Sequence, residues 1–170
     1  RTDASSRFGK DHRWGMFWSL GFMWNIKNEA FLKDIEWLTN AQIKLSTGTS
    51  GNSEIPYYDH LALVAGDANY NDEAGIYPAQ SGNEELSWEQ TWANNIGLTL
   101  GIFNRVNLNV DFYHKKTTNM LMLVPQSYAI TGVGNRWDNI GAMMNRGVEI
   151  AMDGDVIRTQ DFTWNLSAKV

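Results

Sequence analysis

Residues 14–26 have the sequence WGMFWSLGFMWNI, from which the predicted fold follows. Its even-numbered positions, from Trp14 to Ile26, are all apolar, whereas most residues between them are small or polar. Alternation with a period of two is typical of a β-strand that has one apolar face. At about 3.3 Å per residue the stretch reaches about 43 Å, enough to cross a bilayer at a tilt. Strands of soluble domains are usually shorter, about five or six residues.

The same alternation recurs in five later stretches, at residues 41–47, 95–100, 106–113, 148–153 and 162–170. We therefore expect about six strands. Their connections differ in length: those at 101–105 and 154–161 are short, whereas those at 48–87 and 117–136 are long. The link at 27–40 is intermediate, and we expect one helical turn over Phe31–Trp37 in it.

Short turns on one side and long loops on the other predict an all-β fold, a segment of an antiparallel transmembrane β-barrel. The short turns would then be periplasmic and the long loops extracellular. The alternative is a soluble β-sandwich, because a sheet with one buried face produces the same alternation.

Composition excludes several other classes. The chain has 170 residues, of which 43% are hydrophobic, 12% aromatic and 19% charged, with eight Trp. This aromatic content excludes intrinsic disorder, and no run of about 18 apolar residues exists to form a transmembrane helix. The net charge of −5 argues against nucleic-acid binding, and the lack of Cys excludes disulfides and thiolate metal sites.

Six short blocks follow one another along nearly the whole chain. They are RTDASSRFG with RWG (residues 1–9 and 13–15), WL with GTSGN (37–38 and 48–52), LSWE (86–89), DFYHKKT (111–117), NIGAMMNRGVE (139–149) and DFTW (161–164). In this order they resemble the barrel of SusC/RagA-type TonB-dependent outer-membrane transporters.

The resemblance implies a multi-pass protein of the Gram-negative outer membrane that imports oligosaccharides or peptides. Such barrels have about 22 strands and a plug in the lumen. Residues 1–170 would be a partial, mid-barrel segment, with the plug domain and the terminal strands outside this chain. The implied partners are a SusD-like surface lipoprotein, the TonB complex through a missing N-terminal part, the substrate and membrane lipid. We expect no enzymatic activity, no cofactor, no metal and no nucleic acid.

The long loop at residues 48–87 carries the candidate ligand-binding residues. Tyrosine ring faces can stack on sugars, and Asp or Asn oxygens can accept hydrogen bonds from hydroxyls. The expected ligand-binding residues are Tyr57, Tyr58, Asp67, Asn69, Tyr70 and Tyr77. The alternative is that the tyrosines pack the loop against itself. An EF-hand from Asp67 is excluded, because Asp72 replaces the required Gly and Pro78 replaces the bidentate Glu.

Strand parity also divides the remaining side chains into two groups. The polar positions predicted to line the lumen are Asn109, Asp111, Tyr113, Glu149, Asp153 and Asn165. The apolar positions predicted to face lipid are Trp18, Leu20, Phe22, Leu108, Val110, Ile150 and Leu166.

Two rival functions remain open, a soluble carbohydrate-binding β-sandwich and a glycoside hydrolase fragment with paired carboxylates. The sequence does not name the substrate.

Overall fold

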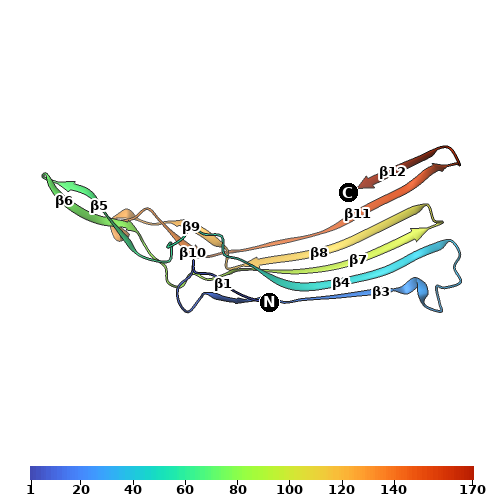
Figure 1. The fold of residues 1–170 in the computed structure, drawn as a ribbon, viewed down its shortest axis with the longest axis horizontal. Helices are drawn as coiled ribbons and strands as arrows, with labels where there is room; N and C mark the ends of the chain where they lie inside the picture. Colours follow the sequence, from blue (N-terminus) through green and yellow to red (C-terminus); the bar gives the residue numbers. More distant parts are fainter. The chain divides into compact units, whose positions relative to one another are not determined.

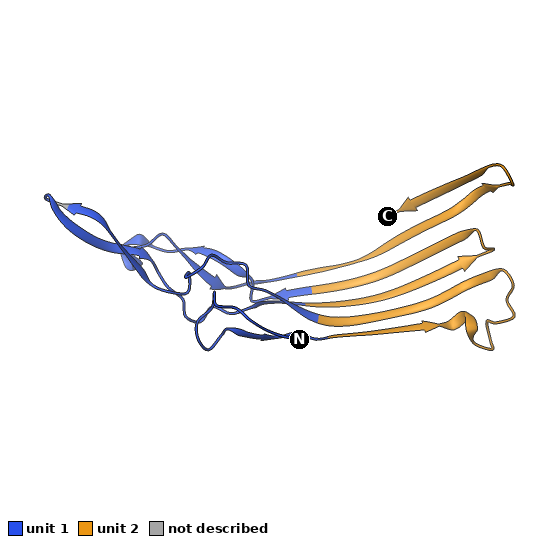
Figure 2. Cartoon of the chain, in the orientation of Figure 1, with its two compact units in different colours: residues 1–18, 49–91, 116–143 blue, residues 19–48, 92–115, 144–170 orange. Residues whose placement is uncertain are grey.

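A computed structural model describes residues 1–170 apart from the side chain of Tyr70. The chain forms two compact units, which are coloured separately in Figure 2 and are described one at a time below. Unit 1 comprises residues 1–18, 49–91 and 116–143, and unit 2 comprises residues 19–48, 92–115 and 144–170.

Strands dominate the described chain (Figure 1). They are β1 (Thr2–Ala4), β2 (Trp14–Met16), β3 (Ser19–Asn25), β4 (Leu38–Asn52), β5 (Leu63–Tyr70), β6 (Glu73–Gln80), β7 (Glu89–Ile102), β8 (Val106–Thr118), β9 (Leu121–Pro125), β10 (Asn135–Asn139), β11 (Ala142–Arg158) and β12 (Thr163–Lys169). The described helices are the short η1 (Ile26–Asn28) and α1 (Tyr128–Thr131), and neither is long and apolar enough to cross a membrane.

The main sheet has six strands in the order β12-β11-β8-β7-β4-β3. These are the six strands that the alternation predicts, and they form an open sheet, as expected of a barrel segment. Most are longer than expected: β11 has 17 residues and β4 has 15. Such lengths exceed the usual strand of a soluble domain.

Within unit 2 the register of the sheet matches apolar with apolar side chains. Phe22 lies opposite Leu45 and Trp24 lies opposite Ile43, whereas Gly21 lies opposite Ser46. Because side chains alternate between the two faces of a strand, this register gathers rings and branched chains on one face. The apolar positions of β3 and β4 therefore share one face, as the alternation predicts, and which face meets lipid stays a prediction.

The connection between β7 and β8 is a tight turn, as predicted. Phe103 and Asn104 both have φ of 53°, and the Arg105 amide donates to the Ile102 carbonyl at 3.0 Å. Two consecutive positive φ angles define a type I′ turn, whose twist matches that of the flanking strands. A second short connection joins β11 to β12, where the Thr159 amide donates to the Phe162 carbonyl at 2.8 Å.

Three expectations need correction. The predicted strand at residues 14–26 is broken, because β2 pairs with β1, β3 pairs with β4, and Phe17 between them turns into a core. Residues 31–37 form turns, not a helical turn. The loop at 48–87 begins within β4 and contains a complete hairpin, β5–β6, with Asn71 and Asp72 at its tip.

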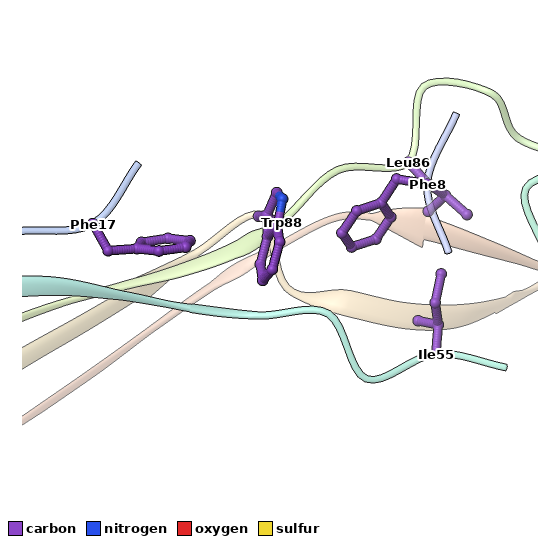
Figure 3. Packing of buried hydrophobic residues seen from close by; sticks show 5 residues of the cluster. All are labelled: Phe8, Phe17, Ile55, Leu86 and Trp88. Atoms are coloured by element: carbon purple, nitrogen blue, oxygen red, sulfur yellow. The ribbon is translucent and has the colours of Figure 1, made fainter. Parts of the chain in front are cut away.

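Unit 1 is organised around a small hydrophobic cluster, the loop core, which consists of Phe8, Phe17, Ile55, Leu86 and Trp88 (Figure 3). The indole of Trp88 meets the rings of Phe8 and Phe17 edge-on, with centroid distances of 5.6 and 5.3 Å. Its Nε1–H donates to the Arg13 carbonyl at 2.9 Å. Gly51 lies against Phe17, where a Cβ would overlap the ring. The core thus joins the first residues of the chain to the connection between β4 and β7.

Replacing Trp88 by Ala should therefore destabilise unit 1. Removal of a buried Trp costs about 3–5 kcal/mol, because apolar contacts are lost and a cavity remains. In the full-length protein, amide hydrogen exchange over residues 53–62 should accelerate. Trp92→Ala is the matched control, since Trp92 lies in unit 2 and is half-exposed. Unchanged exchange in Trp88→Ala would contradict the role of the loop core.

Candidate functional site

The polar face of the unit 2 sheet contains a hollow of about 630 Å³. We call it the polar hollow. Its lining includes Ser46, Asp111, Tyr113, Lys115, Asn145 and Glu149. Three of the residues predicted to line the lumen, Asp111, Tyr113 and Glu149, therefore lie together around one depression.

Two glycines create room beneath these side chains. A Cβ at Gly147 would lie 2.8 Å from the Tyr113 hydroxyl, and one at Gly97 would lie 2.5 Å from an Asp111 carboxylate oxygen. Tyr113 and Asp111 thus fold over neighbouring strands instead of projecting freely.

Cross-strand contacts tie down the other polar side chains of this face. Among them are the remaining predicted residues Asn109, Asp153 and Asn165, which bond within the sheet and do not line the hollow. The contacts are Thr99 to Asn109 at 2.9 Å, Asn107 to Asp153 at 2.9 Å, Asn165 to Asp155 at 3.2 Å and an ion pair between Lys169 and Glu149 at 3.5 Å. The face is polar and internally paired, as a water-facing wall would be.

Unit 1 carries a second cavity of about 250 Å³. We call it the loop pocket. Its lining includes Asp59, Gln80, Ser81, Tyr128, Arg136 and Trp137. The first three belong to the connection between β4 and β7, and the last three to the connection between β8 and β11. Two loops that are distant in sequence therefore build one concave site.

Side-chain amides hold the walls of the loop pocket in place. Gln80 Nε2 donates to the carbonyls of Tyr58 and Leu61, at 2.9 and 2.8 Å. Asn83 Nδ2 donates across the two connections to the Trp137 carbonyl at 3.1 Å. Asn139 makes a reciprocal pair with the backbone of Ser87, at 2.8 and 2.9 Å. Bonds from the lining residue Gln80 and from Asn83 and Asn139, which lie outside the lining, thus hold the pocket in shape.

Asp59 is the electrostatically distinctive residue of the loop pocket. Burial raises the pKa of its carboxyl, although a hydrogen bond from the Trp137 side chain and the neighbouring His60 act in the opposite direction. Within the described residues no ion pair involves Asp59, whereas Arg136 is paired with Asp138 at 2.7 Å. The pocket therefore presents a partly desolvated acid that has His60 nearby but forms no ion pair among the described residues.

The residues predicted to bind ligand are spread over unit 1 and do not form one site. Asp67 and Tyr77 meet each other on the β5–β6 hairpin, where Asp67 raises the pKa of the Tyr77 phenol by hydrogen bonding and by its charge. Tyr57 and Tyr58 lie side by side, with ring centroids 6.5 Å apart. Asn69 lies on β5 opposite Ala74, and the side chain of Tyr70 is outside the described residues.

Tyr128, Arg136 and Trp137 were not identified from the sequence as site residues. Their connection contains the same mixture of aromatic and polar residues as the first one, but nothing in a single sequence indicates which loops meet. Among the described residues, no group of three or more His, Asp or Glu side chains is placed to hold a metal ion.

Comparison with known proteins shows the family to which this chain belongs. The family model described as the TonB dependent receptor-like β-barrel matches residues 1–170. The chain belongs to the SusC/RagA-type TonB-dependent receptors. It is 37% identical over 168 residues to TonB-dependent receptor P39 of Formosa agariphila, covering 98% of this chain and 16% of that protein. To TonB-dependent receptor SusC of Bacteroides thetaiotaomicron it is 36% identical over 182 residues, which cover 100% of this chain and 18% of that protein.

Solved structures show the same relationship. The RagAB peptide importer in its closed-closed state matches with a TM-score of 0.90 and 40% identity, over 99% of this chain and 18% of that one. In the open-open state the TM-score is 0.85. This segment of the receptor thus spans 16 to 18% of the length of these relatives.

Replacing Asp67 by Asn in the receptor should lower the pKa of Tyr77. The substitution removes the negative charge that disfavours the phenolate, so Tyr77 should ionise at a lower pH. The difference in alkaline absorbance titration between Asp67→Asn and the parent should disappear in a Tyr77→Phe background. A difference that persists in that background would show that the two residues are not coupled.

Proposed function

We propose that the receptor imports oligosaccharides or peptides across the outer membrane, and that this chain supplies part of its barrel wall and its outer loops. The observation that carries the proposal is the apolar face of the unit 2 sheet. Leu20, Phe22 and Leu166 are 67, 57 and 55% exposed on this face. Large apolar side chains gathered in this way are costly in water but are suited to lipid.

A soluble carbohydrate-binding β-sandwich is less consistent with this face. A sandwich buries the inner faces of two sheets against each other, and its apolar side chains become inaccessible. The high exposure of Leu20 and Phe22 instead favours a sheet that meets lipid. The family relationship points to transport and gives no support to a glycoside hydrolase.

The proposal includes an orientation of the connections relative to the outer membrane. If the turn at 103–105 is periplasmic, the connections before β7 and after β8 must be extracellular, because each strand crosses the membrane once. The loop pocket and the β5–β6 hairpin would then face the outside, where a SusD-like surface lipoprotein would bind. The plug, the remaining strands and the contact with TonB would come from the rest of the receptor.

Two sets of residues have roles within this proposal. The polar face of the sheet would line the lumen. Its predicted lumen-lining residues are Asn109, Asp111, Tyr113, Glu149, Asp153 and Asn165. On the outer connections, Tyr57, Tyr58, Asp67, Asn69, Tyr70 and Tyr77 would contact the substrate or the lipoprotein. The function is non-enzymatic in this account, since the work is done by binding and energised release.

Proteolysis of intact cells tests the orientation. The hairpin contains Glu73, a cleavage site for a Glu-specific protease, and the tight turn contains Arg105, a site for trypsin. The Glu-specific protease should cut at Glu73 from outside, and Glu73→Gln should abolish that cut. Trypsin should reach Arg105 only after the outer membrane is permeabilised. Cutting at Arg105 in intact cells, with Glu73 protected, would reverse the topology.

Uptake by cells tests the function itself. A strain lacking the receptor should remove either a labelled peptide mixture or a labelled oligosaccharide mixture from the medium more slowly than the complemented strain. Equal removal of both mixtures by the two strains would contradict the proposal.

A further inference from the structure

The loop pocket combines two features that favour a positively charged ligand group. One is Asp59, a carboxylate at the pocket wall with no ion-pair partner among the described residues. The other is a pair of aromatic side chains, Trp137 and Tyr128, on the opposing connection. An ammonium group is stabilised both by a partly desolvated carboxylate and by the faces of aromatic rings.

The two rings are held differently. Trp137 packs against the loop core, which holds it at the pocket wall. Tyr128 is 72% exposed and lies over Gly134, where a Cβ would be 2.7 Å from its hydroxyl. Gly134 thus allows the phenol ring to lie close to the pocket floor, while most of its surface remains available to a ligand.

The charge around the pocket has the sign that a cation requires. Residues 45–104 contain no Lys or Arg. The same segment contains eight acids, Glu54, Asp59, Asp67, Asp72, Glu73, Glu84, Glu85 and Glu89. Arg136 is the basic residue among the lining side chains, and its ion pair with Asp138 offsets its charge. The field of such a segment attracts cations and speeds their association.

The size of the cavity limits what can enter. A volume of about 250 Å³ lies below the range of about 300–1,000 Å³ that is typical of sites for whole small ligands. It therefore suits one residue of an oligomer, with the rest of the chain outside the pocket.

We propose that the loop pocket binds a primary ammonium group carried by the imported oligomer, with Asp59 as its counter-ion and Trp137 and Tyr128 as the rings that face it. This inference rests on the proposed function and specifies the ligand chemistry of one outer site. An ammonium group can come from a lysine-containing peptide or from an oligosaccharide of amino sugars, and the pocket recognises what the two have in common.

Isothermal titration calorimetry on the full-length receptor in detergent tests the proposal. The cationic probes are trilysine and a glucosamine trimer, and their neutral counterparts are trialanine and the N-acetylated glucosamine trimer. At least one cationic probe should bind, more tightly than its counterpart and more weakly as salt is added. Asp59→Asn and Tyr128→Ala should each weaken that binding, Asp59→Asn by about tenfold or more. Asp72→Asn, a matched loss of one charge at the hairpin tip, should weaken it much less, because Asp72 contributes only to the general field and does not line the pocket.

Each outcome of the titrations either supports or overturns the proposal. Binding of trilysine alone assigns the ammonium to a peptide, binding of the glucosamine trimer alone assigns it to an amino sugar, and both support the proposal. Equal affinity for the neutral counterparts, equal losses in Asp59→Asn and Asp72→Asn, or no binding of either cationic probe would overturn it. A receptor with the predicted protease pattern and normal uptake, but without Asp59-dependent binding, would refute this inference and leave the proposed function intact.

Discussion

Side chains of a β-strand alternate between its two faces, and this alternation governs the architecture of the main sheet. Each strand of the main sheet has an apolar face and a polar face. Neighbouring strands must pair in a register that places their apolar side chains on the same face of the sheet. The pairing of Phe22 with Leu45 and of Trp24 with Ile43 satisfies this condition. A slip of one residue would place Lys44 among the apolar side chains. The register of the strands therefore also determines which side chains lie on each face of the sheet.

The connections of unit 1 follow a different logic, because in the proposed topology they lie outside the bilayer. They obtain stability from a few buried rings around Trp88 and from amide side chains such as Asn83 and Asn139, which bond across the two connections. These bonds fix the shape of the loop pocket without occupying it. If the loop pocket binds a ligand as we propose, its lining side chains could vary while these supporting contacts remain.

Sequence patterns were sufficient for the six-stranded sheet and its polar and apolar faces, since alternation is a local signal that survives in any environment. They failed where tertiary contacts override the pattern. Phe17 is a large apolar residue at one of the odd-numbered positions of residues 14–26, and it turns into the loop core and divides the strand. The sequence predicts a loop where the β5–β6 hairpin lies, because Gly, Asn and Asp obscure the alternation of its strands. Asp59 and Trp137 line the same pocket because their two loops are neighbours in space. A single sequence contains no pattern that shows which loops are neighbours.

A single-cysteine scan along β11 measures whether the two faces of the sheet meet different environments. The chain contains no native Cys, so each introduced cysteine in residues 147–153 is the sole thiol in this segment. Each variant of the full-length receptor, reconstituted in lipid, is spin-labelled and probed for collision with oxygen and with a water-soluble nickel chelate. Labels at 148, 150 and 152 should collide preferentially with oxygen, and labels at 147, 149, 151 and 153 with the chelate. Accessibility without a two-residue period, or with the opposite phase, would contradict the account.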